Sequence, residues 1–141
     1  MIQRYDLLKS LPDIPNPHDC VIRSIFQDKD CIVFAFEDQI TNHDSVKYYC
    51  PSAKSLVIRY HLPEMDYALY QHKTKRKLRG AASAYISMPK EALFHLTEGR
   101  YKLEYLYHYI YYGSMILVLS SGRELRLELP DVDCVTYEWI E

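Results

Sequence analysis

The chain has 141 residues, with 17 basic and 19 acidic side chains and a formal net charge of −2. This balance disfavours a dedicated binder of nucleic acid or of an anionic membrane surface. Hydrophobic residues make up 48% and charged residues 26%, a composition typical of folded rather than disordered chains. We expect a single domain over 1–141, with 1–17 as an N-terminal extension and 18–141 as a β core.

The N-terminal segment carries no secretory signal pattern, because no long apolar run follows its basic residues. Purely apolar runs such as Met115–Leu119 are too short to cross a bilayer. The four cysteines form no CxxC pair, so we expect reduced, buried thiols in a cytoplasmic protein. Tyr5–Leu11 is compatible with a short helix, and the prolines of 11–17 exclude helix and central strand.

Two hairpins are expected next along the chain. Residues 20–27 and 31–37 are β-branched and aromatic runs around an acidic turn, and a three-residue turn would pair Gln27 with Cys31. Residues 55–62 alternate apolar and polar side chains, as a half-buried strand does. Residues 67–72 would return antiparallel to that strand, which would bring His61 near His72.

A weaker strand over 81–88 precedes the one helix that the pattern predicts, near 89–98. Pro89 suits the start of a helix and Glu91 its first turn, while Gly99 suits a left-handed stop. The apolar residues of this helix form a narrow stripe that fits packing against a sheet.

A three-stranded meander is predicted for 101–112, 115–120 and 123–129. Gly113-Ser114 and Ser121-Gly122 each suit a two-residue turn, and two-residue turns would pair Tyr111 with Ile116 and Ile116 with Leu127. In that register the three tyrosines at 107, 109 and 111 point inward, because the opposite face of the last strand is charged. Residues 133–140 read as a final strand.

The other face of this meander is mostly apolar, although the predicted register exposes it to solvent. An uncovered apolar patch indicates an interaction surface. The candidate protein-interface residues are therefore His108, Ile110, Tyr112, Met115 and Leu117.

No phosphate-loop, dinucleotide, zinc-protease or hydrolase motif is present, and the six histidines are dispersed, so we assign no catalytic residue, metal ligand or cofactor. One basic run lies before Gly80. It provides the nucleic-acid candidates of an alternative interpretation, in which lysine and arginine neutralise phosphates: Lys73, Lys75, Arg76, Lys77 and Arg79. The ordinary interpretation of the run is a solvated hairpin tip that resists edge-to-edge pairing.

Residues 18–38, HDCVIRSIFQDKDCIVFAFED, resemble the opening of small bacterial β-rich proteins of unknown function. The shared pattern is a His-Asp pair, a strand, an acidic turn and a second strand of Phe-x-Phe type. Some of those proteins resemble immunity proteins, so the resemblance implies a bacterial, cytoplasmic, non-enzymatic binder. It identifies no functional residues.

We expect an all-β fold, an antiparallel sandwich or partly closed barrel of about eight strands with one short helix near 89–98. We expect a protein that is not an enzyme and binds a protein partner, as an immunity-type inhibitor would. One alternative is a barrel that holds a small apolar ligand between the inward tyrosines. The other is nucleic-acid binding through 73–79.

Overall fold

The computed structural model describes residues 1–77 and 80–141, without the side chains of 75–77, 81 and 82. The strands are β1 (Ile2–Asp6), β2 (Val21–Asp28), β3 (Cys31–Phe36), β4 (Ser55–His61), β5 (Ala68–Lys77), β6 (Gly80–Met88), β7 (Leu103–Tyr111), β8 (Ser114–Ser120), β9 (Glu124–Leu129) and β10 (Cys134–Ile140). The helical segments are η1 (Ile40–Asn42), α1 (Asp44–Lys47) and η2 (Lys90–Glu98).

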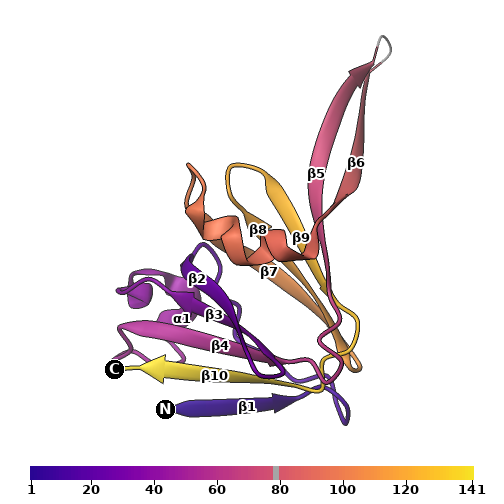
Figure 1. The fold of residues 1–141 in the computed structure, drawn as a ribbon. Helices are drawn as coiled ribbons and strands as arrows, with labels where there is room; N and C mark the ends of the chain where they lie inside the picture. The colour runs from indigo at the N-terminus through magenta and orange to yellow at the C-terminus, as the bar shows by residue number, and fades with distance from the viewer. Residues whose placement is uncertain (78–79) are drawn as a thin grey trace.

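All neighbouring strands are antiparallel, in the order β1-β10-β4-β3-β2-β7-β8-β9-β5-β6. The sheet has two halves of five strands, and β2 joins β7 between them where Val21 pairs with Glu104 and Ile22 with Leu103 (Figure 1). It is not closed, since β1 and β6 are its two edges. The all-β antiparallel prediction is confirmed, with ten strands rather than about eight and a sandwich-like arrangement of the two halves.

The core is formed by the inner faces of both halves. One half contributes aromatic and aliphatic side chains from β3, β4 and β10, and the other contributes mainly leucines from β8 and β9. The largest fully buried side chains of the whole core are Trp139, Tyr60, Tyr105, Tyr137, Phe34 and Phe36. Burial at this density is the main favourable term in the stability of a domain of this size.

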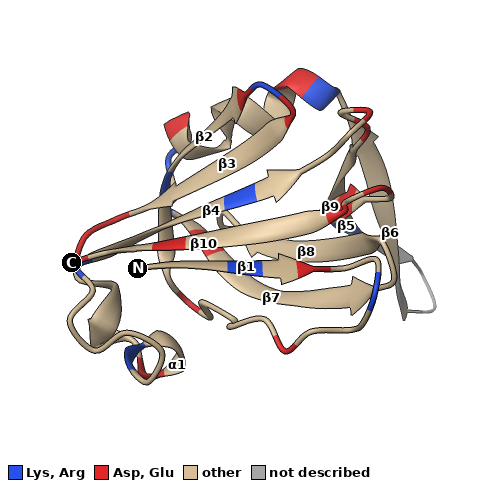
Figure 2. Cartoon of the chain, turned by 90° about the horizontal axis from the view of Figure 1, so that it is seen from below, with Lys and Arg blue, Asp and Glu red and all other residues tan. Residues whose placement is uncertain are grey.

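The N-terminal segment is part of the sheet, which corrects the expected extension and its short helix. Residues 2–6 form β1 beside β10, so the two termini lie close together (Figures 1 and 2). Leu7 is fully buried and its N–H donates to the carbonyl of Asp133 at 2.9 Å. Further on, the hydroxyl of Tyr137 donates to the carbonyl of Pro15 at 2.6 Å, which fixes the proline-rich segment over the core.

The hairpin of β2 and β3 is confirmed, but its register differs from the expected one. The loop has two residues instead of three, with Lys29 at φ 55°, so Asp28 pairs with Cys31. This one-residue shift exposes Phe26 and buries Ile25, because alternate residues of a strand point to opposite faces. An irregularity between residues 22 and 24 then brings Ile22 opposite Phe36.

The meander of β7, β8 and β9 is confirmed, but the expected orientation of its faces is wrong. The second loop has three residues rather than two, so Ile116 pairs with Glu128 instead of Leu127. The first loop, Tyr112-Gly113, shifts the pairing by two, and Tyr109 rather than Tyr111 pairs with Ile116. The two shifts together place Tyr109 on the same face as Glu128, which is the solvent face.

The strand at 55–62 is confirmed as β4, but its expected partner is wrong. After Leu62 the chain crosses to the other half of the sheet, where β5 pairs with β9 and β6. His61 and His72 therefore lie in different halves and do not approach each other across a hairpin. Beyond Gln71, β5 continues past β9 with only β6 beside it, and this hairpin projects from the body of the fold (Figure 1).

The helix near 89–98 is present as a 3₁₀ helix, η2, whose contacts are mainly with β2. Leu93 is the fully buried residue of this helix. The expected left-handed stop at Gly99 is wrong, since Gly99 has φ −76°.

Gly122, in contrast, requires glycine, because its φ is +80° and a Cβ there would lie 2.7 Å from Cδ2 of Tyr101. Gly122→Ala is expected to lower the free energy of unfolding by more than about 1 kcal/mol, since alanine is strained at positive φ. Gly99→Ala is the matched control and should be neutral or slightly stabilising, because its Cβ meets only an ordinary contact at 3.9 Å. Urea unfolding of both variants measures the difference, and equal losses would contradict the turn geometry.

Candidate functional site

The outer face of the half formed by β7, β8, β9, β5 and β6 carries an aromatic surface, which we call the tyrosine face. Its register places the side chains in rows across the strands: Tyr107, Val118, Arg126 and Tyr70 are successive cross-strand partners. The members of the tyrosine face are Tyr107, Tyr109 and Tyr111 on β7, Arg126 on β9, Tyr70 on β5 and Tyr85 on β6.

The tyrosine face is unusual for the solvent side of an antiparallel sheet, where polar side chains normally alternate with buried ones. The exposed fractions of Tyr109 and Tyr111 are 47% and 53%, and that of Tyr85 is 40%. The rings of Tyr107 and Tyr109 contact edge to face, with centroids 5.4 Å apart. High strand propensity accounts for a single outward tyrosine, but a contiguous set is typical of a recognition surface.

Arg126 is held in a fixed position on this surface. Its guanidinium carbon lies 4.3 Å from the ring centroid of Tyr85, in a cation–π arrangement. The hydroxyl of Tyr85 donates to Oε2 of Glu124 at 2.6 Å, and this hydrogen bond raises the pKa of Tyr85. Nε of Arg126 is buried and has no hydrogen-bond partner within the described residues. The geometry therefore presents a preordered guanidinium between half-exposed rings.

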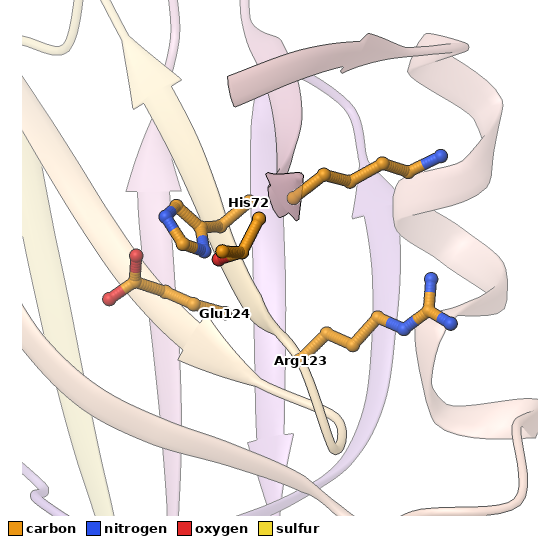
Figure 3. A pocket seen from close by; sticks show the side chains of 5 residues that line it. His72, Arg123 and Glu124 are labelled. Atoms are coloured by element: carbon orange, nitrogen blue, oxygen red, sulfur yellow. The ribbon is translucent and has the colours of Figure 1, made fainter. Parts of the chain in front are cut away.

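The hollow beside this cluster, about 460 Å³, is lined by His72, Lys73, Thr74, Arg123 and Glu124. Figure 3 shows that His72 and Glu124 project to one side of the strands, while Arg123 extends to the other. Groups that bind one small ligand have to converge on it. These do not, so the hollow is a gap beside the projecting β5–β6 hairpin rather than a small-molecule pocket.

The interface candidates expected from the sequence lie mostly on the inner face, which corrects their assignment to an uncovered patch. Met115 and Leu117 are 1% and 0% exposed, and Ile110 packs against the core. His108 also faces inward, where its Nδ1 is hydrogen-bonded to the hydroxyl of Tyr105 at 2.5 Å. Tyr112 alone is well exposed, at 68%, in the loop between β7 and β8.

Tyr107, Tyr109 and Tyr111, which we expected to line an apolar cavity, point outward. The ligand-binding alternative therefore loses the observation on which it rested. The inward tyrosines are different ones: Tyr60, Tyr105 and Tyr137, all fully buried in a packed cluster.

The basic run lies on the β5–β6 hairpin. Lys73 is exposed, whereas Arg79 and the side chains of Lys75, Arg76 and Lys77 lie outside the described residues. Charged residues of both signs are distributed over the two halves of the sheet (Figure 2).

A second cluster lies on the outer face of the other half, where His61 is hydrogen-bonded to Asp133 beside Cys134. The sequence did not indicate this cluster, because His61 and Asp133 lie 72 positions apart in the chain. The sequence likewise did not indicate the contact between Tyr85 and Arg126, because this contact depends on the pairing of β5 with β9.

Comparisons with known proteins found no matching family model, no similar curated protein and no similar solved structure. None of the helices in the described residues has the length and apolarity needed to cross a membrane. The fold and the tyrosine face together define an all-β, sandwich-like chain with an exposed aromatic face.

Proposed function

We propose that this chain is a non-catalytic protein-binding module whose partner docks on the tyrosine face. The observation that carries the proposal is the preordered Arg126, stacked on Tyr85 among exposed tyrosines. Tyrosine and arginine are the residue types that most often dominate binding energy at protein interfaces. Tyrosine adds a large contact area and a hydrogen-bonding hydroxyl at a small cost in conformational entropy.

The charges of the surface indicate the chemistry of the partner. The guanidinium of Arg126 favours an aspartate or glutamate of the partner, because a guanidinium and a carboxylate form paired, charge-assisted hydrogen bonds. Glu124 and Glu128 flank Arg126 on β9 and favour basic side chains around that carboxylate. Apolar side chains of the partner would cover Tyr109 and Tyr111.

Protein is favoured over nucleic acid because Glu124 and Glu128 lie on the same face as the tyrosines. Two carboxylates beside the aromatic rings repel a phosphate backbone, whereas a platform for single-stranded nucleic acid combines stacking rings with positive charge. Binding to this surface would occlude the partner sterically, which is the mode of action of an immunity-type inhibitor in a bacterial cytoplasm.

The test is affinity capture with the tagged full chain from extract of its native cells, before and after nuclease treatment. We expect one stoichiometric protein that survives nuclease and is lost with Arg126→Ala. The truncation of a central interface residue typically costs about 2 kcal/mol or more, which is about 30-fold in affinity. Tyr48→Ala is the matched control, because Tyr48 is 80% exposed but lies beside α1, away from the tyrosine face.

Equal capture by wild type and Arg126→Ala would contradict the docking site. Recovery of nuclease-sensitive material alone would contradict the proposed class of partner and would redirect attention to the β5–β6 hairpin.

A further inference from the structure

A row of metal-binding side chain types crosses three adjacent strands on the half of the sheet that does not carry the tyrosine face. His61 on β4 is the cross-strand partner of Cys31 on β3 and also of Cys134 on β10. Directly paired residues project from the same face of a sheet, with Cβ atoms about 5 Å apart. An imidazole therefore lies between two thiols, and the row is independent of the proposed docking surface.

Asp133 completes the group. Its Oδ1 lies 2.5 Å from Nδ1 of His61. One ligand atom from each of His61, Asp133 and Cys134 lies within 4.8 Å of the other two. All three line a hollow of about 220 Å³ at the surface, together with Cys31 and Arg59. This opening gives an ion a path to the ligands.

We propose that His61, Asp133 and Cys134 form a binding site for a divalent transition-metal ion of the zinc class, with water at the fourth position. Thiolate, imidazole and carboxylate are the donor types of zinc sites in proteins, and three protein ligands with one water make a tetrahedral site. The softness of the sulfur ligand favours zinc over magnesium or calcium, which take oxygen ligands.

The charges around the cluster fit this site. One thiolate, one carboxylate and a divalent ion have no net charge. Arg4 on β1 and Arg59 on β4 line the same hollow, and these two strands flank β10 (Figure 2). Arg59 is paired with Glu138 at 3.3 Å, which offsets its positive charge. The pKa of Cys134 is raised by burial, whereas Arg4 acts in the opposite direction.

Two other interpretations of the cluster are less well supported. A disulfide between Cys31 and Cys134 would have to span β4, and two strand spacings separate Cα atoms by about 9.5 Å, beyond the reach of a disulfide. A cysteine nucleophile activated by His61 needs a thiol of lowered pKa. Burial instead raises the pKa of both thiols, so neither is activated in the absence of a metal.

The test is titration of the reduced, metal-free full chain with cobalt(II) and then with zinc(II). We expect one equivalent of cobalt to bind with the intense visible absorption of tetrahedral coordination and a thiolate-to-cobalt charge-transfer band, and zinc to displace it. Zinc in excess should also raise the midpoint of thermal unfolding, because it binds the folded state and ties β10 to β4.

Ligand variants identify the site. His61→Ala and Cys134→Ser should weaken zinc binding by more than about 100-fold, and the conservative Asp133→Asn by about 10- to 100-fold. Cys31→Ser should keep the charge-transfer band, because Cys31 lines the hollow without being a ligand. The matched controls are His72→Ala and Cys50→Ser, which lie outside the cluster and should bind as the wild type does.

Circular dichroism of each metal-free variant separates loss of a ligand from loss of the fold. Two results would overturn the proposal: the absence of saturable binding at one equivalent in the wild type, or wild-type affinity in folded His61→Ala and Cys134→Ser chains.

Discussion

Leu117→Ala is expected to lower the free energy of unfolding by about 3 kcal/mol, because leucine-to-alanine changes in a packed core cost about 2–5 kcal/mol. Leu117 is 0% exposed in the inner face of β8 and belongs to the main buried cluster. The loss combines the transfer free energy of the missing methyl groups with that of the cavity left behind. Urea unfolding followed by circular dichroism measures it.

Tyr109→Ala is the matched control on the opposite face of the neighbouring strand. Its side chain is 47% exposed, so its truncation should cost less than about 1 kcal/mol, most of it through strand propensity. The sequence alone predicts the reverse ranking, since it places Leu117 outside and Tyr109 inside. A larger loss for Tyr109→Ala than for Leu117→Ala would refute the observed register of β7, β8 and β9.

The second large effect is a loss of stability on acidification through His108. Burial lowers the pKa of His108 from 6.5 to about 4, and the opposing effects of the Ile14 backbone and Asp13 are smaller. Below pH 6.5 the unfolded chain takes up a proton on this histidine, whereas the folded chain does so only near pH 4. The free energy of unfolding should therefore fall between these two values, by at most about 3 kcal/mol.

His108→Gln removes this titration and should flatten the pH dependence of unfolding between about pH 4 and 6.5, whatever its effect on absolute stability. His95→Gln is the matched control, because His95 lies at the surface and is paired with Glu98 at 2.9 Å. Urea unfolding of the wild type and both variants at several pH values provides the comparison. A wild-type slope that persists in His108→Gln would show that other groups are responsible.

The positions of most strands follow from local patterns that the structure confirms. β2, β3, β4 and β10 match alternating or β-branched runs, and the glycines at 113 and 122 mark the loops between β7, β8 and β9. Local backbone preference and side-chain periodicity act over a few residues, so they can be read from the chain directly.

The lengths of the loops determined which face of each strand is buried, and the sequence does not predict a loop length to within one residue. Ser121-Gly122 suits a two-residue turn, yet Arg123 joins the loop, with the N–H of Ser121 donating to its carbonyl at 3.0 Å. One added residue reverses the side of every residue on one strand relative to its partner. The tyrosines consequently moved from the core to the solvent face, and Met115 and Leu117 moved in the opposite direction.

Local sequence patterns also do not predict which strands pair over long distances in the chain. β5 pairs with β9 rather than with the preceding strand β4, because the leucines of β9 and Leu69 bury one another in the second half of the sheet. This choice brings Tyr85 to Arg126. In the same way, the pairing of β10 with β4 brings Asp133 and Cys134 to His61.

The sequence by itself determined the fold class, most of the strands and the absence of the common catalytic motifs, since these depend on composition and short-range periodicity. Only the tertiary structure decided which faces are buried and which side chains meet, because the free energy of packing is summed over residues far apart in the chain. Both candidate sites, the tyrosine face and the cluster around His61, arise at that second level.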